Sequence, residues 1–221
     1  MYIKALSPVI VYAIVTGTIL PVPTSDAKGS LGQANPILYQ SGGMYIDKEQ
    51  EQKAFALLNR VRHDPNSWSE RFGFSLRGIA PRPDLQLDDS LTAVAERKAL
   101  SMAAQGYFGD VDPNGYGINY YINKADYALA PDLIKHKKES NLEAIEGGAA
   151  SGEIAIRNII IDKDKLGDDG RKLLLGIGDY NSASTDVGIG YVHGTGSTKF
   201  RSYTCVIIAK RSKPRASKSG F

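Results

Sequence analysis

The feature that most constrains this chain is a long amphipathic segment that ends in a sharp corner. Asp88 is a residue type that caps helices. Apolar residues then recur at helical spacing on one face, at Leu91, Ala95, Ala99 and Met102. Residues 106–115 (GYFGDVDPNG) follow and contain an Asp-Pro-Asn-Gly turn signal. The pattern predicts a helix packed on a core, with Asp110 and Asp112 at its end either as turn formers or as site residues.

Two more helical patterns precede this corner. Asp47 is a good N-cap for a helix that we predict through Arg62, and Pro65 starts a short second helix. Further along, residues 154–162 are ambiguous, because their isoleucines favour a strand by propensity but also fit one face of a helix.

The end of the chain has the pattern of a β-hairpin. Residues 186–192 and 201–210 are typical of two strands joined by a glycine-containing loop. Gly188 and Gly190 alternate with larger residues, which indicates that another element packs closely on that face. Helices followed by an antiparallel hairpin predict an α+β layered domain.

The N-terminus has the pattern of a secretory signal peptide. Lys4 precedes an apolar segment, residues 5–20, and Ser25-Asp26-Ala27 is a small-x-small cleavage pattern. A membrane anchor is the alternative, but the segment is shorter than the ~20 residues of a typical span. We therefore expect a signal peptide at 1–27, a linker at 28–46 and a domain at 47–209, in a secreted or periplasmic protein.

Charge is distributed unevenly along the sequence. The chain has 27 Lys and Arg against 24 Asp and Glu, but five of the 27 lie in residues 210–221, which leaves 22 against 24. A nearly neutral body does not support a folded basic surface for nucleic acid. We expect residues 210–221 to be a disordered basic tail that makes at most a weak contact with an anionic surface.

The chain has a single cysteine, Cys205, so an intramolecular disulfide is excluded. It lies in an apolar run (YTCVII), where a buried cysteine that acts as a small hydrophobe is expected.

Seven segments in register resemble one family, the CAP superfamily (SCP; cysteine-rich secretory protein, antigen 5 and pathogenesis-related-1), in its bacterial SCP-like extracellular form. The similar segments are LLNRVR with Asp64-Pro65, LQLDDSLTAVA, GYFGDVDPNG, KADY, SNL, DGRKLL and TDVGIG. Their order and spacing hold from about residue 50 to residue 209, which is nearly the whole expected domain. The resemblance implies a three-layer α-β-α sandwich with a mainly antiparallel central sheet, and it makes residues 154–162 a helix.

The sequence departs from the family at its polar centre. The resemblance implies two histidines and acidic residues in a cleft that binds a divalent metal such as zinc. Here Asp110 and Gly170 stand at the two histidine positions, and Ser140 stands at a glutamate position, next to Glu139. Zinc favours imidazole or thiolate ligands, so we expect no metal and no cofactor. The histidines of the chain are expected at the surface; they are His63, His136 and His193.

Two functions stay open. The first is a non-enzymatic exported binding module with a ligand in a groove, either lipid-like, a polysaccharide or a protein. Its predicted cleft residues are Asp110, Ser140, Asn141, Gly170 and Arg171. The alternative is a carboxylate-dependent hydrolase that acts on an envelope or extracellular substrate. It would use Asp110, Glu139 and Glu143 as acid–base groups, with Arg171 as electrostatic stabiliser.

Overall fold

The computed structural model describes residues 40–41, 43–164 and 167–212. The expected signal peptide and most of the expected linker and tail lie outside these residues. None of the helices in the described ranges is long and apolar enough to cross a membrane.

A six-stranded sheet forms the middle layer, in the order β1-β2-β5-β6-β4, with β3 paired to β5. The strands are β1 (Gln40–Ser41), β2 (Met44–Ile46), β3 (Gln86–Leu87), β4 (Glu143–Gly147), β5 (Asp186–His193) and β6 (Ser202–Ala209). Only the short β3–β5 pair is parallel among these pairings; the predicted hairpin is the β5–β6 pair, with Gly190 opposite Cys205. The sheet is therefore mainly antiparallel, as predicted.

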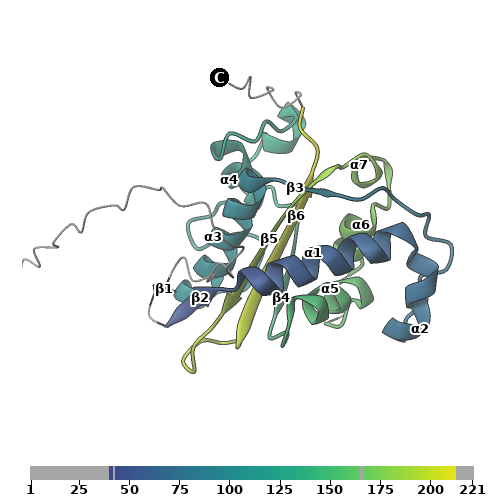
Figure 1. Ribbon diagram of the computed structural model, residues 1–221. Coiled ribbons are helices and arrows are strands. Elements are labelled where there is room, and N and C mark those ends of the chain that lie inside the picture. The colour runs from purple at the N-terminus through teal and green to yellow at the C-terminus, as the bar shows by residue number, and fades with distance from the viewer. Residues whose placement is uncertain (1–39, 42, 165–166, 213–221) are drawn as a thin grey trace, which may run out of the picture. The chain divides into compact units, whose positions relative to one another are not determined.

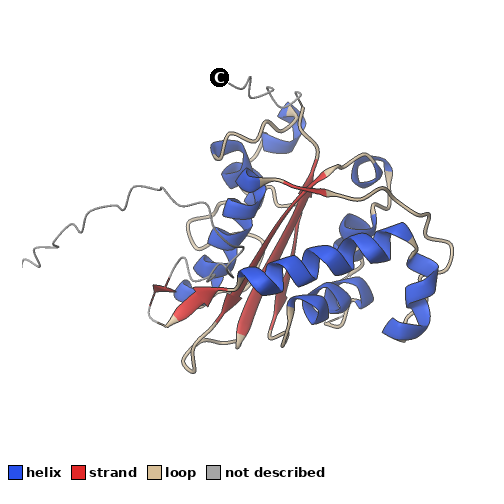
Figure 2. Ribbon diagram, viewed as in Figure 1, coloured by secondary structure: helices blue, strands red, loops and turns tan. Residues whose placement is uncertain are grey.

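Helices cover both faces of this sheet (Figures 1 and 2). One face packs against α3 (Asp89–Gln105) and α4 (Ile118–Lys124). The other packs against α1 (Lys48–His63), α5 (Gly152–Ile161) and α6 (Asp169–Leu175). Shorter elements lie between them: η1 (Pro65–Trp68), α2 (Ser69–Phe72), η2 (Pro131–Ile134) and α7 (Asp179–Ser182). The α+β three-layer sandwich is confirmed, and the ambiguous segment 154–162 belongs to a helix.

The central helix α3 forms as the sequence predicts. The carboxylate of Asp88 accepts hydrogen bonds from the backbone N–H groups of Ser90 and Leu91, and Gly106 ends the helix in the left-handed conformation (φ 68°). The helix lies so close to β5 that a Cβ added at Gly188 would come within 2.1 Å of the Leu91 backbone. This explains the glycine alternation in β5.

The domain begins earlier than expected. Residues 28–46 were predicted as a linker, but β2 pairs with β5, with Tyr45 opposite His193 and Ile46 opposite Val192. Met44 and Ile46 are 8% and 2% exposed, so the strand contributes to the core. A strand of three residues is too short to show a clear alternating pattern, which is why the sequence did not reveal it.

The predicted tail also needs a correction at its start, because Arg211 is held by the domain. Its guanidinium bonds to the Asp88 carboxylate (2.7 Å), lies 4.0 Å from Asp186, and stacks 4.1 Å from the centre of the Tyr127 ring. The next residue, Ser212, donates its backbone N–H to the Ala128 carbonyl. Burial alone would raise the pKa of Asp88, but the Arg211 bond and the helix-capping N–H groups bring it below its ordinary value.

We expect Arg211→Ala to lower the free energy of unfolding by about 1–3 kcal/mol, because it leaves the buried Asp88 carboxylate without its cation. Urea denaturation checks this value. Lys210→Ala is the matched control, since the Lys210 ammonium lies over the Tyr180 ring and has no carboxylate partner among the described residues. Equal stabilities of the two variants would contradict the role of Arg211.

Candidate functional site

A groove of about 730 Å³ lies beside β4, an end strand of the sheet. It is bounded by the corner after α3, the end of α5 and the start of α6. Four of the five predicted cleft residues line it: Asp110, Ser140, Asn141 and Gly170. The fifth, Arg171, does not; its guanidinium stacks 4.7 Å from the centre of the Phe74 ring. The prediction that Arg171 lies in the cleft is therefore wrong, because consecutive residues of α6 point in different directions.

The three catalytic candidates separate in the structure. Asp110 is exposed at the groove, and Glu143 lines it with a side chain that is 0% exposed. Glu139 does not line the groove; its carbonyl accepts the Asn119 N–H, and its Oε2 atom is buried without a hydrogen-bond partner. A shared acid–base arrangement of Asp110, Glu139 and Arg171 is not formed.

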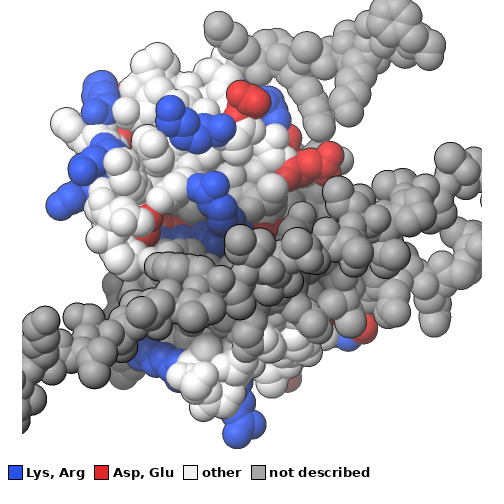
Figure 3. Space-filling view, turned by 90° about the vertical axis from the view of Figure 1, so that its left-hand side faces the viewer, with Lys and Arg blue, Asp and Glu red and all other residues white. Residues whose placement is uncertain are grey.

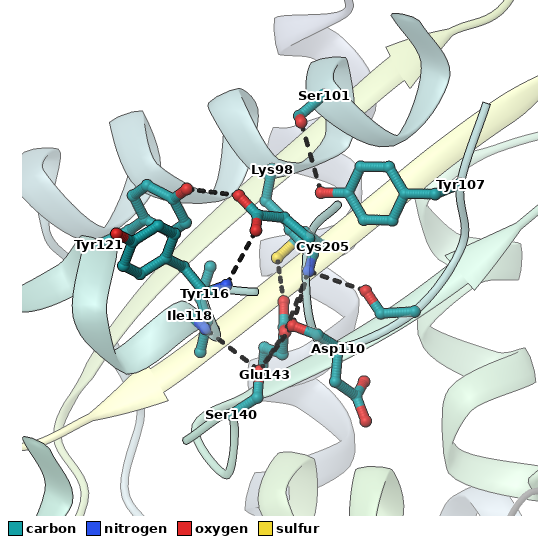
Figure 4. A network of polar contacts seen from close by, with 12 residues as sticks. Lys98, Ser101, Tyr107, Asp110, Tyr116, Ile118, Tyr121, Ser140, Glu143 and Cys205 are labelled. Atoms are coloured by element: carbon teal, nitrogen blue, oxygen red, sulfur yellow. Dashed lines mark hydrogen bonds and ion pairs between the residues drawn. The ribbon is translucent and has the colours of Figure 1, made fainter. Parts of the chain in front are cut away.

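The centre of the site is occupied by Lys98, from α3. Its Nζ atom donates hydrogen bonds to the carbonyls of Gly109 (2.8 Å) and Asp110 (2.9 Å), and it lies 3.4 Å from Glu143 Oε1. The Lys98 side chain is only 4% exposed. Figure 4 shows that the Asp110 carboxylate points away from this ammonium. The ammonium therefore donates two hydrogen bonds to backbone carbonyls and forms an ion pair with the Glu143 carboxylate.

Glu143 has further partners on both oxygens. The Ser140 hydroxyl donates to Oε1 at 2.5 Å, and the Cys205 thiol donates to Oε2 at 3.5 Å (Figure 4). Burial raises the pKa of Glu143 to about 7, although Lys98 and Ser140 act in the opposite direction. Burial also raises the pKa of the Cys205 thiol well above its ordinary value. Cys205 is buried, as predicted, and belongs to this polar centre.

Stability should depend on pH through Glu143. Its pKa rises from an ordinary 4.5 to about 7 in the folded state, so between these values the folded chain holds a proton that the unfolded chain has released. The stabilisation is fully present below pH 4.5 and is lost as the pH rises through about 7. We expect Glu143→Gln to remove up to about 3 kcal/mol of this fall in unfolding free energy.

Urea denaturation at a series of pH values measures this effect, with the exposed Glu70→Gln as control. Burial and the neighbouring Glu96 also raise the pKa of Glu51 to about 7. Glu51 should therefore still make the unfolding free energy fall with pH in the Glu143→Gln variant. An unchanged slope in Glu143→Gln would contradict the prediction.

The residues present do not fit the zinc site that the resemblance to the CAP superfamily implies. The described part of the chain holds no group of three or more His, Cys, Asp or Glu side chains that could bind a metal ion. Lys98 places a positive charge beside the buried carboxylate of Glu143, where a metal cation would be repelled. At the second histidine position, a Cβ on Gly170 would lie 2.9 Å from Ile159 Cγ2, so a larger side chain requires Ile159 to move. This centre is built around an ammonium ion of the protein itself.

The histidines lie away from this centre. His63 and His136 are exposed, as predicted. His193 differs from the expectation: it is half-buried, with Nε2 2.9 Å from an Asp47 carboxylate oxygen and its ring stacked on Tyr45. The β2–β5 pairing, which the sequence did not reveal, places these residues together.

Lys98 is the functional residue that the sequence analysis missed. Lys98 lies seven residues after Leu91 and four residues before Met102, which places it on the apolar face of the helix. A lysine in an apolar stripe is rarely buried without a partner, so this position was a usable signal for a buried ion pair. The partner could not be identified, because Glu143 lies on a distant strand.

Comparisons with known proteins give likenesses of fold. No family model matches the sequence, and no curated protein matches it. An outer surface protein from Borrelia burgdorferi is similar in structure, with a TM-score of 0.49 and 15% identity over 74% of this chain and 94% of that one. An extracellular protein containing an SCP domain from Bacillus anthracis has a TM-score of 0.46 and 19% identity, over 74% of this chain and 41% of that one. The CAP domain of enterococcal PrgA has a TM-score of 0.38 and 17% identity, over 79% of this chain and 67% of that one.

The solved structures similar to this chain thus include SCP-domain and CAP-domain proteins. The three layers are those that the motifs predict, and the motif residues Asp110, Ser140 and Gly170 meet at one groove. These likenesses concern the fold alone, so the ligand is argued from the groove itself.

Proposed function

We propose that this chain is an exported, non-enzymatic binding module whose ligand lies in the groove beside β4. Export is supported by the signal-peptide pattern of residues 1–27. The observation that carries the proposal is the Lys98 ammonium, which is bonded to Gly109, Asp110 and Glu143. The side chains that could act in catalysis at this centre, Lys98 and Glu143, are paired with each other. The groove outside this pair stays open.

The charge of the groove indicates the chemistry of the ligand. Its lining carries six carboxylates, at Asp110, Glu143, Glu146, Asp162, Asp164 and Asp169, against two ammonium groups, at Lys163 and Lys172. Lys98 neutralises only one of the six. Complementary charge favours a positively charged partner over a neutral or anionic lipid-like one. We therefore propose that the groove binds a basic polypeptide segment of a partner protein.

The alternative, a carboxylate-dependent hydrolase, has one observation in its favour. A pKa of about 7 suits Glu143 for general acid–base work at neutral pH. Its side chain is 0% exposed, however, and Glu139 and Arg171 lie off the groove. A hydrolase would need the substrate to reach Glu143 behind Ser140.

Calorimetric titration of the full chain with an oligolysine peptide tests the binding proposal. We expect binding that Asp110→Asn/Asp169→Asn weakens about tenfold, because both exposed carboxylates line the groove. The matched control, Asp84→Asn/Asp132→Asn, removes the same charge outside the groove and should bind like the wild type.

Equal weakening in the two double variants would contradict the proposal, as would tighter binding of oligoglutamate. Cleavage of the peptide by the wild type and not by Glu143→Gln would favour the hydrolase instead.

A further inference from the structure

A second surface, outside the groove, combines aromatic rings with unpaired cations. Tyr116, Tyr120 and Tyr121, at the start of α4, contact one another. The rings of Tyr116 and Tyr120 are stacked with centroids 4.4 Å apart, and Tyr121 meets Tyr120 edge-on at 5.3 Å. The Tyr121 hydroxyl donates to Asp112 Oδ2 at 2.5 Å, which fixes the cluster to the corner after α3.

Each of these rings carries a different cation. The Arg97 guanidinium lies 4.5 Å from the centre of Tyr121, the Lys124 ammonium 5.7 Å from Tyr120, and the Lys137 ammonium 5.1 Å from Tyr116. The three cations come from α3, α4 and the segment after η2, and all three side chains are exposed. We call the three tyrosines and three cations together the tyrosine platform.

The cations of the platform have no carboxylate partner within the described part of the chain. The side chains of Arg97, Lys124 and Lys137 form none of the ion pairs or hydrogen bonds there, whereas those of Lys48, Lys53 and Lys172 are each paired with acidic side chains. Lys135 and Lys138 are exposed on either side of Lys137 in the sequence. Figure 3 shows Lys and Arg side chains gathered on the upper part of the face that carries α3 and α4. The nearly neutral charge of the body therefore conceals a local concentration of positive charge.

We propose that the tyrosine platform binds a polyanionic polysaccharide, a glycan that carries carboxylate or sulfate groups. Its three cations would pair with the anionic groups along the chain. The hydroxyls of Tyr116 and Tyr120 make no hydrogen bond within the described residues and would bond to sugar hydroxyls. Tyrosine and arginine are also the residue types that interfaces favour.

The ring geometry favours a glycan over single-stranded nucleic acid. Nucleobases need free aromatic faces on which to stack. Here Tyr116 and Tyr120 cover each other, and each has an ammonium over its ring as well. Ring edges, hydroxyls and cations remain for a ligand, and these groups suit hydroxyls and anions better than flat bases. This site is independent of the groove proposed above.

Calorimetric titration of the full chain with heparin, a sulfated polysaccharide, tests the proposal. We expect Lys124→Gln/Lys137→Gln to weaken binding about tenfold or more and to flatten its salt dependence, because two charge contacts are lost. The control Lys53→Gln/Arg77→Gln removes the same charge at exposed positions off the platform and off the groove, and should bind like the wild type. Tyr116→Phe/Tyr120→Phe keeps the rings, removes the free hydroxyls and should weaken binding severalfold.

A chain that ends at Ser212 separates the platform from the basic tail and should retain most of the heparin affinity. Loss of all affinity in this shortened chain would overturn the proposal, as would equal weakening by the platform and control variants. Tighter binding of oligothymidylate of matched charge would assign the surface to single-stranded nucleic acid instead. Binding of anionic phospholipid vesicles without heparin binding would assign it to a membrane surface.

Discussion

Lys98→Met is expected to lower the free energy of unfolding by about 3–5 kcal/mol at about pH 8, because Glu143 loses its cation and must either stay charged in a buried site or take up a proton. Lys98 and Glu143 are 4% and 0% exposed and lie 3.4 Å apart. Methionine preserves much of the volume of the lysine stem, so the loss reports the missing charge more than a cavity. The Gly109 carbonyl, which Lys98 now bonds, also loses its donor, and the Asp110 carbonyl keeps only the Ser140 hydroxyl.

The pH dependence separates this charge effect from a packing defect. At about pH 5 Glu143 is protonated in the folded chain, because its pKa is raised to about 7, so the loss in Lys98→Met should shrink. The double variant Lys98→Met/Glu143→Leu should recover most of the stability, since an apolar replacement of a buried pair is often neutral. Denaturant titrations of both variants at the two pH values provide the measurement. A loss that is independent of pH and is not rescued would show that Lys98 acts only through packing.

Gly190→Ala should be similarly harmful, with a loss of about 3 kcal/mol or more in unfolding free energy. A Cβ at this position would lie 2.4 Å from the backbone nitrogen of Glu96 and 2.5 Å from the Ala95 carbonyl carbon. Backbone atoms of α3 cannot rotate away as a side chain can, so the whole helix must move off β5. The same motion would shift Lys98, which lies on that helix, away from Glu143.

The control for this prediction is Gly196→Ala, in the exposed loop between β5 and β6, where an added Cβ has no neighbour within 4 Å. It should change stability by less than about 0.5 kcal/mol. Denaturation midpoints compare the two variants. If Gly190→Ala were as stable as Gly196→Ala, the close packing of α3 on β5 would not be required by the fold.

Local patterns predicted the elements that local physics controls. The capped α3, the glycines of β5 and the hairpin of β5 and β6 all follow from spacing within a short window, and the structure contains them. The strand β2 was missed because its stability comes from pairing with the distant β5. Arg211 was assigned to a disordered tail because its partners Asp88 and Tyr127 lie far back in the chain.

The sequence by itself determined that this protein is an α+β layered domain with a corner after α3. It also determined which side chains stand at the two histidine positions of the CAP superfamily, which the sequence resembles. Those properties depend on residue type and on contacts between near neighbours in the chain. Only the tertiary structure decided that Lys98 fills the polar centre, that Arg171 turns away from the groove, and that three cations gather on one tyrosine cluster. Each of these depends on the approach of segments separated by many residues, and the direction of a side chain at such a contact is set by the packing of whole elements.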